Sequence, residues 1–268
     1  MKSYLTYFRI RIIASLQYRA AALAGLTTQL FFGFVFIMVY LAFYESNGTI
    51  VAPMKWQELV NYMWLSQAFF ALTYPSQADH ELLDMIKNGN IAYEILRPQN
   101  FYLRWYVKMI ATKTTSTMLR FWPIIIIGLL LPYPYHLSAP IALSNFFLFI
   151  IALIFACLLI SALIVLIHIL SMFTIDSKGL LSIYGVIAEV FMGGTIPIPF
   201  FPIWLQKIAY ALPFRYISDF PFRLYSGSIP LTDGYSLLLQ SFIWIIVTIA
   251  IGLLITKLAL RKAVIQGG

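Results

Sequence analysis

The most apolar stretch of this chain covers residues 141–173 and has the sequence IALSNFFLFIIALIFACLLISALIVLIHILSMF. A helix needs about 20 apolar residues to cross a bilayer, and this stretch is longer than that. The whole chain of 268 residues is similar in character, because 61% of the residues are hydrophobic, 10% are charged and the mean hydropathy is +0.86. Soluble domains carry about 25% charged residues. The sequence therefore predicts an all-α integral membrane protein. It excludes a soluble enzyme, a nucleic-acid reader and, with Cys157 as the single cysteine, a disulfide scaffold.

Six stretches of the chain are candidate spanning helices within a single transmembrane domain, 1–268. The predicted spans are about residues 20–44, 59–78, 110–131, 141–173, 180–196 and 235–258. The fifth of these is short, and the third is interrupted by Lys113, Arg120 and Pro123. Six spans place both termini on one side of the membrane.

The distribution of basic residues orients these spans. With the termini in the cytoplasm, Arg120 lies within a span and 13 of the 18 basic residues fall on the cytoplasmic side. Positive residues in short loops mark the cytoplasmic side. The net charge of +8 is thus explained by topology and requires no nucleic acid as a partner. The basic residues on the predicted outer side are Lys55, Lys207, Arg215 and Arg223.

Residues 1–19 precede the first span and are amphipathic. Leu5, Phe8, Ile12 and Leu16 recur at helical spacing among several cations. This pattern is typical of a helix that lies in the interface, with its charges toward anionic lipid headgroups. The alternative is a solvated basic leader that only sets the topology.

Residues 79–109 form the longest predicted cytoplasmic segment. Its first part, 79–87, has acids near the start and a lysine at the end, followed by Asn88-Gly89-Asn90, which predicts a short helix and its stop. Leu82, Leu83 and Ile86 would form a small apolar patch for docking on a partner. An ordinary intracellular loop is the alternative.

The segment of residues 193–234 is too apolar for a solvated loop and too rich in proline for a spanning helix. Non-helical backbone at membrane depth is tolerated where protein buries it or where it lines a cavity. We therefore expect short re-entrant helices at the outer leaflet. An aromatic belt of Trp204, Tyr210, Tyr216 and Tyr225 is a second interpretation, and both can hold.

Enzymatic chemistry has little support in the sequence. There is no GxxxxGK[ST] phosphate-binding loop, no zincin motif after His80-Glu81 and no GxSxG elbow. The chain is therefore expected to bind no metal or cofactor and to lack an ATPase site of its own.

Three ionisable residues are predicted at membrane depth: Arg120, His168 and Glu189. Each costs at least about 2.5–3.5 kcal/mol near the bilayer centre if it is unpaired and faces lipid. We expect Arg120 and Glu189 to face the protein interior, and they could form a pair. That pair would either fix helix packing or lie on a transport path.

The order of these features resembles the membrane-spanning subunits of ABC-2 type transporters. One similarity is the six-span plan with its N-terminal amphipathic helix. A second is the segment from Glu81 to Pro98, which ends in YEILRP and departs from the family pattern at Asn90-Ile91. A third is the outer segment from Gly193 to Phe214, in which glycines, prolines and Trp204-Leu205 follow the order found in the family.

The resemblance implies the permease subunit of an ATP-driven exporter in the bacterial plasma membrane. Two permeases, identical or homologous, would face each other across a pathway lined by spans one, two and five. They would bind two P-loop ATPase subunits, which hold ATP and Mg²⁺. An ATP-independent carrier or channel is the alternative.

The resemblance also assigns residues to these roles. The coupling segment that contacts the ATPase would comprise Glu81, Leu82, Leu83, Asp84, Ile86, Lys87, Gly89, Arg97 and Pro98. The outer re-entrant gate would comprise Gly193, Gly194, Pro197, Pro199, Pro202, Trp204, Pro213 and Phe214.

Overall fold

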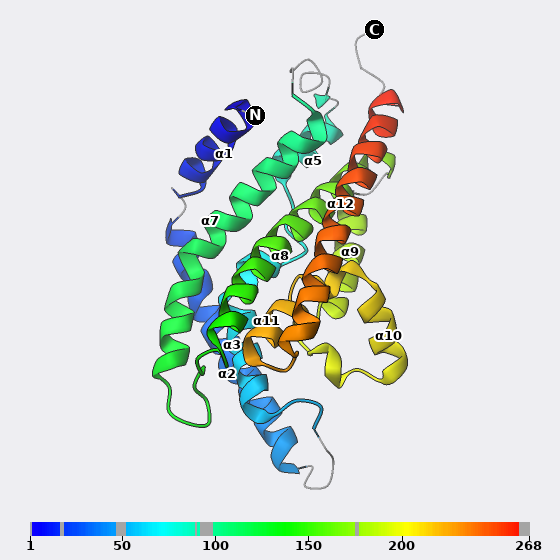
Figure 1. Ribbon diagram of the computed structural model, residues 1–268. Helices are drawn as coiled ribbons and strands as arrows, with labels where there is room; N and C mark the ends of the chain where they lie inside the picture. Colours follow the sequence, from blue (N-terminus) through cyan, green and yellow to red (C-terminus); the bar gives the residue numbers. More distant parts are fainter. Residues whose placement is uncertain are drawn as a thin grey trace.

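The computed structural model describes residues 2–16, 19–46, 52–88, 90–91, 99–174 and 177–262. Within these ranges every regular element is a helix and there is no strand, so the predicted all-α class is confirmed (Figure 1). The longer helices are α1 (Lys2–Ser15), α2 (Arg19–Ser46), α3 (Trp56–Ala68), α7 (Phe101–Leu130), α8 (Leu143–Leu170), α9 (Ser177–Phe191) and α12 (Leu231–Lys262). The shorter ones are α4 (Phe70–Thr73), α5 (His80–Lys87), η2 (Ser171–Phe173), η3 (Ile198–Phe200), α10 (Ile203–Ala211), η4 (Pro213–Tyr216) and α11 (Asp219–Ser226).

Three stretches of the described helices are long and apolar enough to cross a membrane on their own. They cover Gly25–Ser46, Leu143–Phe173 and Leu231–Arg261, which correspond to the predicted first, fourth and sixth spans. The other three predicted spans fall short for different reasons. The second is divided between α3 and α4, the third carries charges within α7, and α9 has only 15 residues.

The second predicted span is broken at Phe69 and ends before a proline. Phe69 leaves the helical region at φ −99° and ψ 13°, although its N–H still donates to the carbonyl of Leu65. Helix α4 then ends at Thr73. The next residue, Tyr74, precedes Pro75, which disfavours helical backbone geometry at Tyr74. The chain passes from there through residues 75–79 into α5.

Helix α8 is the centre of the bundle. It packs against α12, α7 and α11, and in Figure 1 it runs through the middle of the molecule. Its side chains join a buried cluster that includes Tyr102 of α7 and Phe220 of α11. A second cluster surrounds Trp64 of α3, whose ring meets Phe34 of α2 edge to face. Because α3 is buried from Leu59 to Ala68, its polar residues face protein rather than lipid.

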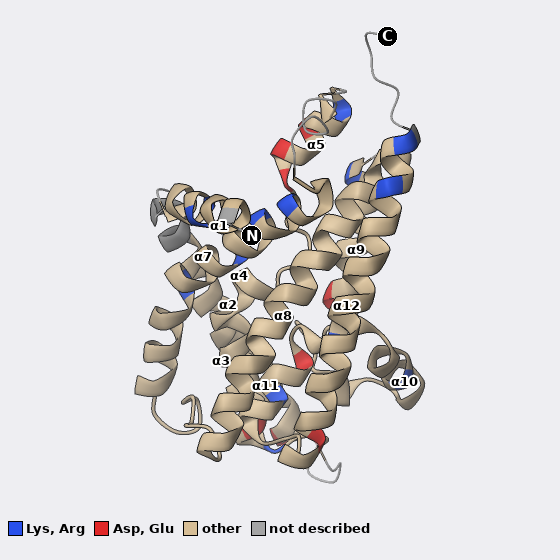
Figure 2. Cartoon of the chain, turned by 45° about the horizontal axis from the view of Figure 1, so that its top comes forward, with Lys and Arg blue, Asp and Glu red and all other residues tan. Residues whose placement is uncertain are grey.

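Charged residues lie at both ends of the bundle, and one end carries a gathering of Lys and Arg. Figure 2 shows Lys and Arg on α1, around α5 and at the end of α12, which lie at the same end of the molecule. We call this the α5 end. The short elements η3, α10, η4 and α11 lie toward the opposite end (Figure 1).

Candidate functional site

Helix α5 has a capped first turn. Asp79 precedes the helix with extended backbone, and its Oδ1 accepts a 3.2 Å hydrogen bond from the N–H of Leu82. An acid here satisfies a free N–H group and suits the positive end of the helix dipole, while Lys87 suits the other end. The short helix that the sequence predicts at residues 79–87 is therefore confirmed, with Asp79 as its cap.

One lysine of α7 joins the two acids at the start of α5. Nζ of Lys108 lies 2.7 Å from Oδ2 of Asp79 and 2.7 Å from Oε2 of Glu81. The ammonium group also lies 4.4 Å from the centroid of the Trp105 ring. The Lys108 and Asp79 side chains are 9% and 10% exposed, so this ion pair is nearly buried. From the sequence, Lys108 has only a role in topology, because its partners are 29 and 27 residues away and no local pattern joins them.

Helix α1 is connected to α5 through an arginine. Nη2 of Arg11 lies 3.0 Å from Oε1 of Glu81, and Nε of Arg11 donates to the hydroxyl of Tyr7 at 3.0 Å. Burial alone would raise the pKa of Glu81, but the hydrogen bonds from Lys108 and Arg11 outweigh it and lower this pKa below the ordinary value. Since α1 also packs along α7, it is held against the bundle rather than only in the interface.

The histidine of α8 fixes the link before α5. The backbone N–H of Asp79 donates to Nε2 of His168 at 2.9 Å, and Nδ1 of His168 lies 2.7 Å from the carbonyl oxygen of Ile164. Because Nε2 accepts, the proton of the neutral ring is on Nδ1, which donates to Ile164. His168 is fully buried. His168, one of the three predicted intramembrane polar residues, therefore has a structural role, because it positions α5.

A buried lysine closes the end of α4. Nζ of Lys113 donates to the carbonyl oxygens of Tyr74 at 2.6 Å and of Ala71 at 3.3 Å. The last carbonyls of a helix have no partner within the helix. Lys113, which interrupts the predicted third span, thus supplies the donor that the broken second span needs.

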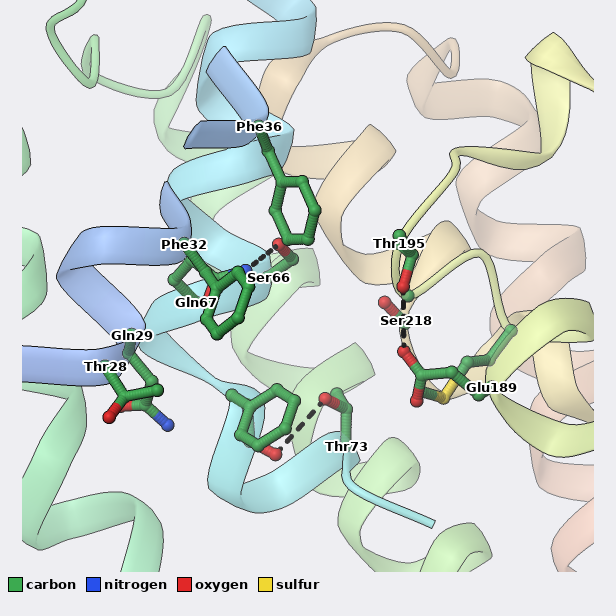
Figure 3. Close-up of a pocket in the computed structure, with 13 residues that line it drawn as sticks. Thr28, Gln29, Phe32, Phe36, Ser66, Gln67, Thr73, Glu189, Thr195 and Ser218 are labelled. Carbon is green, nitrogen blue, oxygen red and sulfur yellow. Dashed lines mark hydrogen bonds between the residues drawn. The ribbon is translucent and has the colours of Figure 1, made fainter. Parts of the chain in front are cut away.

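A cavity of about 230 Å³ lies between α2, α3, α4 and α9. Figure 3 shows the side chains that line it from these helices and from the turn after α9. Its lining residues are Thr28, Gln29, Phe32 and Phe36 of α2, Ser66 and Gln67 of α3, Phe70 and Thr73 of α4, Glu189 of α9, and Met192, Gly194, Thr195 and Ser218.

The turn after α9 depends on two glycines. Gly193 has φ +75°, a conformation that side chains disfavour, and its carbonyl accepts a 2.7 Å hydrogen bond from the buried hydroxyl of Tyr62. A Cβ at Gly194 would collide with Oε1 of Glu189. This oxygen also lies 3.4 Å from the hydroxyl of Thr195, which donates to it. The two glycines therefore allow the turn to wrap around the Glu189 carboxylate.

These features agree with a comparison against protein-family models, in which the model described as ABC-2 family transporter protein matches residues 28–267. The chain belongs to the ABC-2 transporter family. It is a membrane permease subunit of an ABC-type transporter and is not itself the ATPase. Neither the comparison with curated proteins nor that with solved structures finds a match.

The predicted coupling residues of this ABC-2 chain do not share one exposed face. Leu82 is 1% exposed and packs in the main core cluster, so its predicted place in an exposed docking patch is wrong. Asp84 and Lys87 are exposed, and Leu83 and Ile86 are partly buried. Glu81 is exposed but its carboxylate is engaged by Arg11 and Lys108. Gly89, Arg97 and Pro98 lie outside the described residues.

The prolines of the predicted outer segment begin its short helices. Pro197, Pro202 and Pro213 stand at the starts of η3, α10 and η4, where a missing N–H costs no hydrogen bond. The carbonyl of Pro199 accepts from the side chain of Gln206. Trp204 is 65% exposed on α10. Phe214, which is partly buried, packs near the ring of Tyr184.

The predicted pairing of Arg120 with Glu189 is not found among the ion pairs that join described residues. The guanidinium of Arg120 lies against α2, where a Cβ at Gly25 would be 3.2 Å from Nη1. Glu189 instead interacts with Thr195 and lines the cavity of this ABC-2 chain. The helices α7 and α9 therefore present these two residues to different neighbours.

Proposed function

We propose that this chain is the permease subunit of an ATP-driven ABC-2 exporter in the bacterial plasma membrane. It crosses the membrane six times with both termini in the cytoplasm, and it faces a second copy of itself or a homologous permease. Two separate P-loop ATPase subunits bind ATP and Mg²⁺. The gathering of Lys and Arg at the α5 end supports this orientation (Figure 2).

The observation that carries the proposal is the attachment of α5 to three other helices. Asp79 and Glu81 are joined to Lys108 of α7, Glu81 to Arg11 of α1, and the amide of Asp79 to His168 of α8. A displacement of α5 by a partner is therefore transmitted to α1, α7 and α8 together. Meanwhile Asp84 and Lys87 remain exposed for contact with the ATPase.

The six-span plan is compatible with the three helices that fall short of spanning on their own. The α3–α4 pair is largely buried, and the carbonyls exposed at its end are satisfied by Lys113. Broken helices at membrane depth are tolerated when protein surrounds them in this way. In α7 the side chains of Lys108 and Lys113 are likewise satisfied within the protein rather than exposed to lipid.

The substrate pathway is proposed to follow α2, the α3–α4 pair and α9. These helices line the cavity of about 230 Å³, and they correspond to spans one, two and five. Apolar residues are also exposed on α2 and α9, including Phe31, Met38, Val39, Ile183 and Val186. A second permease would cover this face. The segment of residues 193–234 would close the outer end of the pathway, and the exposed Trp204 would anchor it in the interface.

The test is co-purification of the chain with its ATPase from native membranes in mild detergent. Asp84→Arg reverses an exposed charge on α5 and should reduce the recovered ATPase strongly, while membrane insertion stays normal. Asp233→Arg is the matched control, because Asp233 is an exposed acid in the first turn of α12 at the opposite end of the bundle. Equal recovery of the ATPase with both variants would overturn the assignment of α5 to coupling. Reproducible purification of the chain alone, even after crosslinking through α5, would favour an ATP-independent carrier.

A further inference from the structure

We propose that the cavity between α2, α4 and α9 binds a cationic, hydrogen-bond-donating head group of an amphipathic substrate. This inference rests on the proposed function, because it names the class of substrate for the same pathway. Its basis is the carboxylate, the amide and the aromatic rings that line the cavity. Figure 3 shows Gln29 of α2 and Glu189 of α9 on opposite sides of it.

Gln29 presents an acceptor that the protein leaves unused. Its side chain is 5% exposed, and among the described residues no donor lies within hydrogen-bond distance of its Oε1. A buried polar atom without a partner costs about 1–3 kcal/mol. Because Gln29 lines the cavity, rotation of its side-chain amide would turn this buried oxygen toward a bound donor.

Glu189 supplies the charge opposite Gln29. Its Oε1 receives one long hydrogen bond of 3.4 Å from Thr195, and no ion pair between described residues includes Glu189. None of the 13 residues that line the described cavity is Lys, Arg or His. With Glu189 ionised, the lining attracts cations and repels anions. A bound cation in turn favours the ionised form of this carboxyl group.

Aromatic rings form another part of the wall. Phe32, Phe36 and Phe70 line the same cavity from α2 and α4. The face of an aromatic ring attracts an organic cation and also buries the apolar atoms next to it. A carboxylate, a side-chain amide and phenyl rings together are groups that bind a primary ammonium attached to an apolar body.

The size of the cavity limits what enters it. Pockets that enclose drug-sized ligands measure about 300–1,000 Å³. A cavity of about 230 Å³ holds the head group and the first part of an apolar chain. Phe32 on its rim is 43% exposed, so the remainder of the substrate can extend along α2 toward the face that a second permease would cover.

The experiment measures binding to the full chain in nanodiscs of zwitterionic lipid, without ATP and with empty nanodiscs as background. The probes are 2-phenylethylammonium, the anion 3-phenylpropionate and the neutral 3-phenylpropanol, which have similar size and one phenyl ring. Saturation-transfer difference NMR as a function of probe concentration gives the affinities. We expect saturable binding of the cation that is at least about ten-fold tighter than binding of either analogue, because a charge-assisted hydrogen bond is about twice as strong as a neutral one.

Variants locate the site. Glu189→Gln should weaken binding of the cation by about ten-fold or more, and Gln29→Leu by a smaller factor, since it removes a neutral acceptor. Glu189→Asp keeps the charge and should retain part of the affinity, which separates loss of charge from misfolding. Glu45→Gln makes the same chemical change at the exposed end of α2, away from the cavity, and should leave binding unchanged.

Two results would overturn the proposal: equal binding of cation and anion, or cation binding that survives Glu189→Gln. Because the assay needs no ATPase, a failure here with normal ATPase co-purification would reject the cationic site alone. Loss of co-purification in the wild-type chain would instead reject the proposed function.

Discussion

The backbone N–H of Asp79 donates a 2.9 Å hydrogen bond to Nε2 of His168, which joins the cap of α5 to the last turns of α8. The same ring donates through Nδ1 to the carbonyl oxygen of Ile164 within α8. Both ring nitrogens are therefore used within the protein. A residue that the sequence singles out as a polar group at membrane depth thus holds the start of α5 in place.

Substitution of His168 by leucine should loosen the start of α5. His168→Leu removes the acceptor of the partly buried Asp79 N–H, which costs about 1 kcal/mol or more. We expect the amide of Asp79 to exchange its hydrogen roughly ten-fold faster in hydrogen-exchange mass spectrometry of the full chain. His136→Leu, in the connection between α7 and α8, serves as the control and should leave that exchange unchanged. An unaltered Asp79 amide in His168→Leu would contradict the positioning role.

Loss of Lys108, whose ammonium group is shared by Asp79 and Glu81, should destabilise the chain more than loss of a surface lysine. Lys108→Met leaves Asp79 nearly buried without its partner. Breaking a buried pair on one side costs about 3–5 kcal/mol, so the free energy of unfolding should fall by about 3 kcal/mol. Thermal unfolding in detergent provides the measurement. Lys207→Met changes an exposed lysine of α10 and should have little effect. Similar melting of the two variants would show that the Lys108 pair contributes little.

The contact between α1 and α5 should depend on pH through Glu81. When α1 contacts α5, the pKa of Glu81 is lowered by Lys108 and Arg11. The stabilising contribution of Glu81 is therefore complete above the ordinary glutamate pKa of 4.5 and is lost as the pH falls through the lowered pKa. A spin-label distance between α1 and α5 should therefore lengthen at acidic pH. Arg11→Gln removes one partner and should reduce the dependence on pH. If the distance between α1 and α5 depended on pH in the same way in the wild type and in Arg11→Gln, that result would argue against this ion pair.

The turn after α9 should tolerate no side chain at Gly193. A Cβ there would require left-handed geometry and would lie 2.8 Å from the hydroxyl of Tyr62. Because left-handed geometry alone costs a residue with a Cβ about 1–2 kcal/mol, Gly193→Ala should destabilise by about 2 kcal/mol or more. Tyr62→Phe, which removes the hydrogen bond to Gly193, should cost about 1 kcal/mol.

A double-mutant cycle separates strain from steric contact at this turn. If the Tyr62 hydroxyl blocks the new Cβ, Gly193→Ala should cost less in the Tyr62→Phe background than in the wild type. If the changes in unfolding free energy of the two single variants simply add in the double variant, backbone strain alone explains why residue 193 is a glycine.

Local sequence patterns predict the individual helices well. The acids, the lysine and the Asn-Gly stop around residues 79–90 predict a short helix at 79–87, and the structure confirms it as α5 at His80–Lys87 and adds Asp79 as its cap. The uninterrupted apolar stretch at residues 141–173 predicts α8, which the structure places at the centre of the bundle. Both predictions depend on neighbours within a few turns, which is the range over which helical periodicity and capping act.

The same patterns fail where a residue is satisfied from far away in the chain. Lys113 weakens the predicted third span, yet its ammonium serves carbonyls near Tyr74 in the preceding helix. Leu82 belongs to a predicted exposed patch but is buried. The proposed pair of Arg120 and Glu189 matches opposite charges by depth alone, and depth does not fix which faces of α7 and α9 meet.

The sequence by itself determines that this chain is helical, apolar enough for a membrane and similar to ABC-2 permeases, because composition, capping and motifs are local properties. Only the tertiary structure decides which charges meet. Arg11 and Glu81 are 70 residues apart, and Asp79 and His168 are 89 apart. Packing around α8 brings these groups within 3.0 Å, since buried polar groups must find partners wherever the folded chain supplies them.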